Sequence, residues 1–341
     1  MDLLTQAALG AILAQALVGG QTRRAPLLGA ALGVLPDADT LLSPLLDELE
    51  RLRFHRNLSH SLLACALLPP LLGSLLHRLG SRGRPPDEAG VSRGRWILLI
   101  GLVWLTHVLL DCCTTFGTQL WQPFSAEPVA WRIVSVIDPG VTLPLLLGLF
   151  LGWRLPERAK RCAWAGLAGA CLYLALCCVA KAIVTQRSVE ASILAGLDPQ
   201  RTLSKPTLFN ALLWRVVVED EAGFWVGYTS LLDSGPLRYH RRVLRHEERW
   251  GPWAERVEAR DLRRILAEAY TLEREPSGAL LVSDLRYGQW AAWTSEETPY
   301  VFAYRLEEDE GRLRVTTPPR AGLSREQRQS YLRRVLGEGP N

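Results

Sequence analysis

Residues 96–113 read WILLIGLVWLTHVLLDCC, an apolar run whose only acid and base, Asp111 and His107, lie near its end. A run of this length and composition can cross a membrane as an α-helix. It opens with Trp96, a residue that favours the boundary between lipid and water. The sequence therefore predicts a transmembrane helix with two ionisable side chains close to one end.

Further apolar segments lie on both sides of this run. The three stronger ones are residues 60–79, 139–153 and 162–184. Pro69-Pro70 should kink the first, the second is short for a full span, and the third stays apolar until Lys181. Two weaker stretches come earlier, residues 3–20 and 25–36. The latter is too short to cross alone and is expected to be a half-span packed within the bundle.

The composition changes after residue 184. Residues 1–184 hold nearly all the long apolar runs and are predicted to form a transmembrane helical domain, whereas residues 185–341 are rich in Arg and Glu and read as a soluble α+β domain. Within the latter, two β-rich runs in 209–233 flank a turn at Gly223, the signature of a hairpin. The other expected elements are strands at 279–285, 299–306 and 312–316, and helices at 253–270 and 323–337. The fold class is thus a helical membrane bundle followed by an α+β domain with an antiparallel sheet.

Charge and cysteine content narrow the possible partners. The net charge is only +4 and no basic stripe with interleaved aromatics occurs, so nucleic-acid binding has little support. All seven cysteines lie in or beside apolar segments, none after Cys178, which is not a disulfide framework. Cys112 and Cys113 adjoin Asp111 and are conceivable thiolate ligands, although small buried hydrophobic residues are the default reading. The N-terminus lacks the pattern of a cleaved signal peptide.

Loop charge predicts the orientation in the membrane. The loop at 114–138 has one basic residue, Arg132, whereas the loops on either side of it are rich in arginine. The basic residues of those two loops are Arg78, Arg82, Arg84, Arg93 and Arg95, and Arg154, Arg158, Lys160 and Arg161. The positive-inside rule places both Arg-rich loops in the cytoplasm, and the turn with Arg23 and Arg24 fits the same side. The protein is then expected to lie in the inner (cell) membrane with its C-terminal domain outside the cytoplasm. There the domain could cover a site on the outer face of the membrane.

The same orientation brings the acids and histidines together. Segment 96–113 runs outward to His107 and Asp111, and segment 60–79 begins on the outer face. His55 and His60 stand at that start, Asp37 and Asp39 follow segment 25–36, and Asp138 precedes segment 139–153. Ionisable groups at membrane helix ends are costly to desolvate, so they pair, bind a metal or line a pathway. The sequence therefore predicts one shared site at the outer face.

Three motifs supply this site, and each has a plainer reading. Asp37-Ala38-Asp39 after Pro36 can bring two carboxylates to a cation, or can simply cap a helix. In His55-Arg56-Asn57-Leu58-Ser59-His60-Ser61, His60 at a helix start suits a neutral metal ligand, and the plainer reading is two interfacial histidines. His107 and Asp111, at i and i+4, share one helical face. They could both bind one metal ion, Asp111 could orient His107 as a ligand, or the two could simply form an internal hydrogen bond.

His77, His240 and His246 lie among arginines and read as solvated surface. The chain shows no phosphate-binding glycine loop, no nucleophile elbow and no convincing Ser-His-Asp series.

These motifs, in this order, resemble the YdjM-like family of membrane-bound metal-dependent hydrolases. The resemblance covers most of the chain. It rests on MDLLTQ at 1–6, LPDAD at 35–39, HRNLSHS at 55–61, THVLLD at 106–111, TFGTQLWQPF at 115–124, IDP at 137–139, WRVV at 214–217 and SDLRYG at 283–288.

The resemblance implies metal-assisted hydrolysis, with the polar family positions matched by Asp37, Asp39, His55, His60, His107 and Asp111. The chain departs from the family at Thr5-Gln6, where members commonly have Thr-His. If that histidine is a ligand, this chain has one fewer, since an amide oxygen binds zinc weakly.

The leading hypothesis is an integral membrane hydrolase with a divalent ion, zinc or else manganese, at the outer face. Asp37, Asp39 and His60 are its candidate catalytic residues, together with Arg56, which would steady an anionic substrate. A phosphoester or lipid headgroup is the expected substrate because the site would lie at headgroup depth. The first alternative is a non-enzymatic membrane protein in which the polar residues tie helices together. The second is a cation-binding or transport protein.

Overall fold

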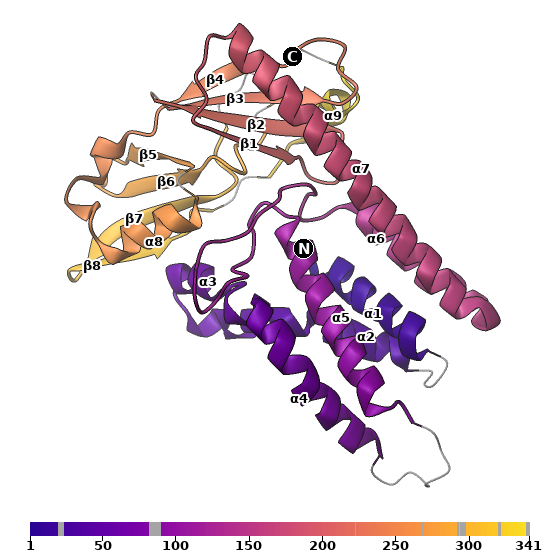
Figure 1. Cartoon of the computed structure of the whole chain (residues 1–341). Coiled ribbons are helices and arrows are strands. Elements are labelled where there is room, and N and C mark those ends of the chain that lie inside the picture. Colours follow the sequence, from indigo (N-terminus) through magenta and orange to yellow (C-terminus); the bar gives the residue numbers. More distant parts are fainter. Residues whose placement is uncertain are drawn as a thin grey trace. The chain divides into compact units, whose positions relative to one another are not determined.

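The computed structural model describes residues 1–19, 24–81, 90–221, 223–267, 269–291, 293, 298–319 and 322–338. The chain forms two compact units. The first comprises Met1–Leu42, Phe54–Cys178 and Leu208–Asn210, and the second comprises Ser43–Arg53, Val179–Thr207 and Ala211–Asn341. The first is helical and the second contains antiparallel sheets, which confirms the predicted fold class (Figure 1).

The helices of the first unit follow the apolar segments of the sequence. They are α1 (Leu3–Val18), α2 (Ala25–Val34), the 3₁₀ helices η1 (Leu35–Leu45) and η2 (Leu58–His60), α4 (Leu62–Ser81), α5 (Arg93–Cys112), α6 (Pro139–Arg154), η3 (Pro156–Arg158) and the first part of α7 (Ala159–Leu194). Within the described part of the chain, four helical segments are long and apolar enough to cross a membrane: Ala25–Leu45, Leu62–Ser81, Arg93–Cys112 and Pro156–Leu194.

Two of these segments are longer than expected. The half-span at 25–36 continues as η1 through Leu45, because Pro36 lies in the first turn of the 3₁₀ helix, where its missing N–H costs little. Helix α7 runs to Leu194, ten residues past the predicted end at 184. Helix α4 contains Pro69 and Pro70 and is continuous from Leu62 to Ser81. Arg23, Arg82 and Arg84, used above to predict orientation, lie outside the described residues.

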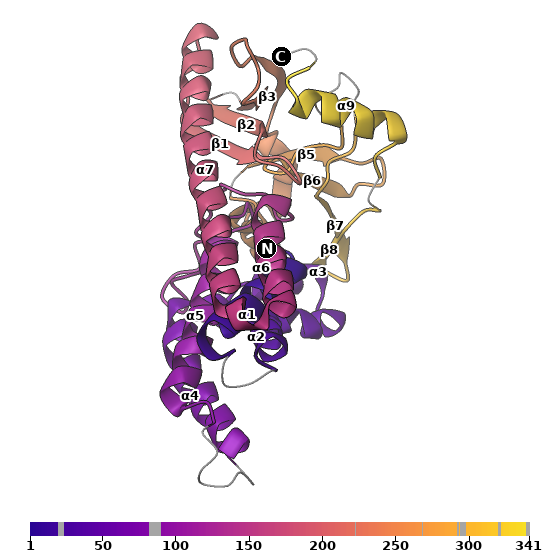
Figure 2. The same cartoon turned by 90° about the vertical axis from the view of Figure 1, so that its right-hand side faces the viewer.

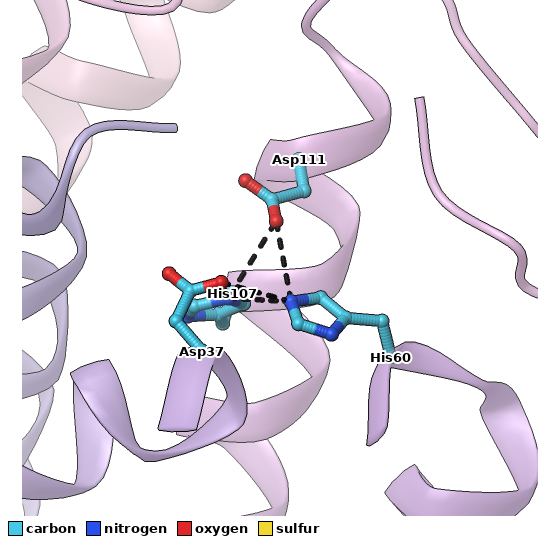
Figure 3. A group of neighbouring side chains, drawn as sticks. All are labelled: Asp37, His60, His107 and Asp111. Atoms are coloured by element: carbon cyan, nitrogen blue, oxygen red, sulfur yellow. Dashed lines mark hydrogen bonds and ion pairs between the residues drawn. The ribbon is translucent and has the colours of Figure 1, made fainter. Parts of the chain in front are cut away.

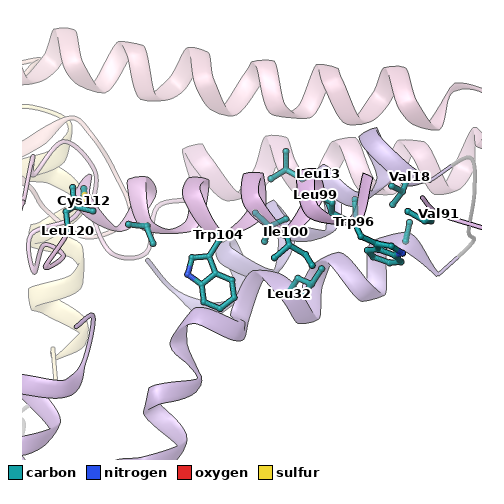
Figure 4. Close-up of a cluster of buried hydrophobic side chains, with 14 residues drawn as sticks. Leu13, Val18, Leu32, Val91, Trp96, Leu99, Ile100, Trp104, Cys112 and Leu120 are labelled. Atoms are coloured by element: carbon teal, nitrogen blue, oxygen red, sulfur yellow. The ribbon is translucent and has the colours of Figure 1, made fainter. Parts of the chain in front are cut away.

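Helix α5 is the centre of the first unit. Its buried side chains, among them Leu99, Ile100 and Trp104, pack against Leu13 of α1 and Leu32 of α2 in one apolar cluster (Figure 4). Helix α4 lies beside α5, and its residues Leu68 and Leu72 pack on the same cluster (Figure 1). The predicted transmembrane run at 96–113 is therefore the helix around which its neighbours assemble.

Helices α1 and α2 approach each other through glycines. A Cβ atom added to Gly10 would overlap the carbonyl oxygen of Gly29, and one added to Gly33 would overlap the carbonyl oxygen of Gln6. The two backbones are thus in direct contact, as happens between membrane helices with small residues at the interface. This contact sets the position of the chain that follows α2, which carries Asp37.

The second unit contains two four-stranded antiparallel sheets. Their strand orders are β1-β2-β3-β4 and β5-β6-β7-β8 (Figure 1). The strands are β1 (Arg201–Pro206), β2 (Leu213–Asp220), β3 (Gly223–Ser230), β4 (Tyr239–Val243), β5 (Tyr270–Arg274), β6 (Leu280–Asp284), β7 (Ala303–Asp309) and β8 (Arg312–Thr316). The remaining elements are α3 (Glu48–Phe54), η4 (Glu247–Trp253), α8 (Val257–Ile265) and α9 (Arg325–Val335).

The hairpin expected in 209–233 is confirmed as β2 and β3, joined at Gly223, and β6, β7 and β8 match the other predicted strands. The helix predicted at 253–270 is wrong in its length. It ends at Ile265 because Ala267 takes a positive φ of 51°, after which Tyr270 begins β5. Strands β1, β4 and β5 were not expected from the sequence.

Strand β2, in the first sheet of the second unit, is buried on both faces. One face packs against Val184 and Ala191 of α7 through Trp214 and Val216. The other carries Leu213 and Val217 into a core with Leu285 and with Val335 of α9 (Figure 2). This burial on both faces explains why β2 reads as a continuous apolar run. A third core, around Trp250 and Tyr270, includes Leu49 of α3.

Candidate metal centre

Four of the predicted site residues form one buried cluster, here called the tetrad: Asp37, His60, His107 and Asp111. One ligand atom from each lies within 4.8 Å of those of the other three. Asp37 comes from η1, His60 ends η2, and His107 and Asp111 lie one turn apart on α5. Their side chains point toward one another (Figure 3) and are at most 7 % exposed.

The closest approach in the tetrad is between two imidazole nitrogens. Nε2 of His60 lies 3.1 Å from Nε2 of His107, 3.2 Å from Oδ1 of Asp37 and 3.4 Å from Oδ2 of Asp111. Nε2 of His107 lies 3.7 Å from Oδ1 of Asp37 and 3.6 Å from Oδ2 of Asp111. Two nitrogens and two oxygens therefore converge on one small volume.

Contacts behind the rings hold both histidines in place. Nδ1 of His107 lies 2.8 Å from the carbonyl oxygen of Gly33, which can only accept, so this nitrogen carries a proton. A neutral His107 then presents the lone pair of Nε2 to the cluster. Nδ1 of His60 lies 2.9 Å from Oγ of Ser59, an arrangement that can fix the same tautomer. A ring oriented by its distal nitrogen is characteristic of metal-binding histidines.

The donor set fits a divalent cation. Among the described residues, Oδ1 of Asp37 and Oδ2 of Asp111 are buried without a hydrogen-bond partner, although both face the histidines. A buried carboxylate oxygen without a partner is costly, and facing lone pairs repel each other unless a cation or a proton lies between them. Two imidazoles and two carboxylates at this spacing suit the tetrahedral coordination of zinc.

Further polar groups surround Asp111. Its Oδ1 accepts from the amine of Met1 and, at 3.1 Å, from Nε2 of Gln6. Nε of Arg56 lies 3.1 Å from Oδ2, outside hydrogen-bond geometry, and its NH1 donates to Oγ1 of Thr114 and to the carbonyl oxygen of Gly117. Arg56 is thus buried beside Asp111 and bonded to protein atoms. Its action on a substrate stays a prediction.

Asp39 and His55 form a second group with Asp37, here called the triad. Nδ1 of His55 lies 3.5 Å from Oδ2 of Asp39, and the two side chains are 33 % and 15 % exposed. The His55 ring packs on Phe116, with centroids 5.6 Å apart. The six predicted ligand positions are therefore brought to one place, as two groups that share Asp37. Their roles as ligands stay a prediction.

Other residues named from the sequence lie elsewhere. Asp138 caps α6 and accepts a hydrogen bond of 2.8 Å from the hydroxyl of Tyr173. Among the described residues, no cysteine belongs to either group of candidate ligands. His77 packs near Val91, with Nδ1 3.2 Å from its carbonyl oxygen.

Sequence reasoning missed the groups behind the ligands. The position of Ser59 next to His60 was a possible signal for its contact with the His60 ring. Gln6 was noticed only as a departure from the family, although its side chain donates a hydrogen bond to Asp111. The carbonyl oxygen of Gly33 has no side-chain signature at all.

Apolar helices of membrane-spanning length, with a buried Asp/His cluster among them, define an integral membrane protein with a candidate metal centre. A family model described as YdjM inner membrane protein matches residues 1–184, more than half of the chain. The chain therefore belongs to the YdjM family of inner membrane proteins, which confirms the YdjM-like resemblance over residues 1–184. The metal-dependent hydrolase activity that the resemblance implies stays a prediction. Comparisons with curated proteins and with solved structures found no match.

Proposed function

We propose that the chain is an integral membrane hydrolase that depends on a divalent metal ion bound by Asp37, His60, His107 and Asp111. The observation that carries the proposal is the convergence of four ligand atoms within 4.8 Å in a site from which water is nearly excluded. Zinc is the first candidate, since two imidazoles and two carboxylates are typical zinc ligands, and manganese is the second.

The residues of the metal centre have different roles. The ion, when bound, would acidify a water molecule and polarise a carbonyl or phosphoryl group. Gly33 and Ser59 orient the two histidines, and Gln6 orients Asp111. Asp39 and His55, which are part-exposed, are the groups on the side that a substrate can reach.

The proposed substrate is a phosphoester or a lipid headgroup. His107 and Asp111 lie in the last turns of α5, and His60 lies just before the start of α4. The centre therefore lies at the ends of these two helices, although Asp37 lies inside the segment Ala25–Leu45. That is headgroup depth for helices that cross the bilayer. The loop charges favour the outer face, with the C-terminal part of the chain also outside the cytoplasm. Arg56 carries the positive charge next to the centre.

A non-enzymatic role is the second candidate, and the surroundings of Asp111 favour it. The amine of Met1, Arg56 and Gln6 all contact this carboxylate, as expected of a polar cluster that ties helices together. A cation-binding or transport protein would use the same acids. It would bind metal, unlike the structural cluster, but would not hydrolyse esters.

The deciding experiment is elemental analysis of the full chain purified in detergent. We expect stoichiometric zinc or manganese in the unmodified protein and its loss in His60→Ala and Asp111→Ala. His77→Gln is the matched control, because His77 lies near the far end of α4 and its substitution should leave the metal content unchanged. A metal-loaded protein is then assayed against phosphodiesters and phospholipids. Metal-free protein after reconstitution would contradict the proposal, and bound metal without turnover would favour the cation-binding role.

A further inference from the structure

We infer that the centre takes two divalent cations that share Asp37, one held by the tetrad and a second held by the triad of Asp37, Asp39 and His55. The inference rests on the proposed function and assigns different tasks to the two ions. The tetrad ion is the enclosed one, whereas the triad ion is the one that makes direct contact with an anionic phosphoester substrate.

The shared carboxylate is the geometric basis. Asp37 belongs to both groups of ligand atoms, and each group is confined to within 4.8 Å. The His55 and His60 rings, one from each group, have centroids only 6.4 Å apart. A carboxylate has two oxygens and can offer one to each of two neighbouring ions. Sites of this kind, with two close ions, are common in enzymes that cleave phosphoesters.

The triad has unsatisfied donor atoms of its own. Among the described residues, Oδ1 of Asp39 and Nδ1 of His55 are buried without a hydrogen-bond partner. These two side chains form an ion pair, but its distance of 3.5 Å from Nδ1 to Oδ2 is not that of a hydrogen bond, so Nδ1 is left without one. The Oδ2 atom already accepts the backbone N–H of Arg56 at 3.2 Å. Both free atoms are therefore available to a cation.

The side chains of the tetrad and the triad differ in exposure, and this difference separates the roles of the two ions. The tetrad provides four protein ligands, all at most 7 % exposed, so a substrate has less access to it than to the triad. The triad provides three, and His55 and Asp39 are 33 % and 15 % exposed. Closed sites with four protein ligands are typical of structural ions, whereas catalytic sites keep an open position. The difference in access predicts that the two ions exchange at different rates.

Metal content and release by a chelator test this division on the full chain in detergent. We expect two equivalents of zinc, one removed quickly by EDTA and one slowly. Asp39→Asn and His55→Gln should each lose the fast equivalent and keep the slow one, and His107→Gln should lose the slow equivalent. His77→Gln should keep both, as the matched control. The slow equivalent in Asp39→Asn also shows that this variant is folded.

Manganese tests the shared carboxylate separately. Two Mn²⁺ ions bridged by Asp37 should give an exchange-coupled EPR spectrum, which Asp39→Asn should convert into that of an isolated ion. One equivalent of zinc in the unmodified protein would overturn the inference, and the proposed function would stand if that protein hydrolysed phosphoesters. No bound metal would overturn both. Two equivalents retained in Asp39→Asn, or two uncoupled Mn²⁺ ions, would also overturn it.

Discussion

At the scale of single residues, Gln6 shows how a side chain outside the ligand set can control the centre. It is fully buried, and its Nε2 donates to Oδ1 of Asp111 at 3.1 Å and to the carbonyl oxygen of His107 at 3.3 Å. Gln6→Leu removes both donors, so Asp111 is less well oriented. We expect metal affinity to fall by about 10- to 100-fold, the usual effect of losing such a partner. Competition with a zinc indicator measures this, and an unchanged affinity would show that Gln6 only fills space.

Lys205, in the second unit, is another residue with a specific prediction. It lies opposite Arg215 in the β1–β2 pairing and over the ring of Tyr287. Burial, reinforced by Arg215 and partly opposed by Asp284, lowers the pKa of Lys205 to about 7. Its amine should therefore react with acetic anhydride with a midpoint near this pH, measured by mass spectrometry. Lys160, which is exposed in the first turn of α7, is the internal comparison. A midpoint near 10 for Lys205 would contradict the prediction.

The sign of the stability effect follows from the same pKa. The unfolded chain holds the Lys205 proton up to a pKa of about 10.4, whereas the folded chain releases it near 7. Between these values the unfolded state binds more protons, so the contribution of Lys205 to stability rises with pH. Below pH 7 the cost of burying the charged amine is fully present. Lys205→Met should raise the Tm most at or below pH 7 and leave it nearly unchanged above about pH 10. An equal shift at all pH values would contradict this.

The sequence was informative about ligands because a membrane makes ionisable residues rare. Asp37, His60, His107 and Asp111 stood out at the ends of apolar segments, and loop charge put them on one face. The division into tetrad and triad was not predictable, because it depends on side-chain exposure. The orienting carbonyl oxygen of Gly33 was not predictable either, since every residue has one.

At the scale of secondary-structure elements, the contact between α1 and α2 carries a prediction. A methyl group on Gly33 would overlap the backbone of Gln6, and one on Gly29 the backbone of Gly10. Gly33→Ala should destabilise the protein by about 1–3 kcal/mol, as overpacking does, and should also weaken metal binding because Gly33 orients His107. Thermal unfolding and metal content measure the two effects.

Gly80→Ala is the control for this test. Gly80 also lies in a helix, α4, and a Cβ atom there meets nothing within 4 Å. The substitution should leave metal content unchanged and slightly favour the helix. If Gly33→Ala behaved like Gly80→Ala, the helices would not be in the close contact described.

Predictions of element type succeeded where one segment contains its own signal. The β2–β3 hairpin has both strands and its turn within 213–230, and α4 and α5 each contain a long apolar run. Predictions of length failed where burial by distant residues decides. Helix α7 continues past Lys181 because that amine bonds the carbonyl oxygen of Ser204 and because Val184 and Ala191 pack on β2. Tertiary packing of this kind overrides local propensity.

At the scale of the whole molecule, the orientation in the membrane is the main prediction. The Arg-rich loops predict that the C-terminal part of the chain lies outside the cytoplasm. Ser277 lies in an exposed turn of the second unit, and all cysteines of the chain precede residue 179. Ser277→Cys should therefore react with a membrane-impermeant maleimide added to spheroplasts, above the background of the unmodified protein. Labelling only after lysis would show the opposite orientation. It would contradict both the prediction from the loop charges and the assignment of the metal centre to the outer face.

The glycine contact between α1 and α2 also limits how such a chain can change over evolutionary time. Gly10, Gly29 and Gly33 already have the smallest side chain, so every substitution there adds atoms. At an ordinary core position, a larger side chain can be accommodated by a smaller one at a neighbouring position. In a contact between two backbones there is no side chain that could become smaller. The contact between α1 and α2 therefore tolerates fewer substitutions than an ordinary core position does.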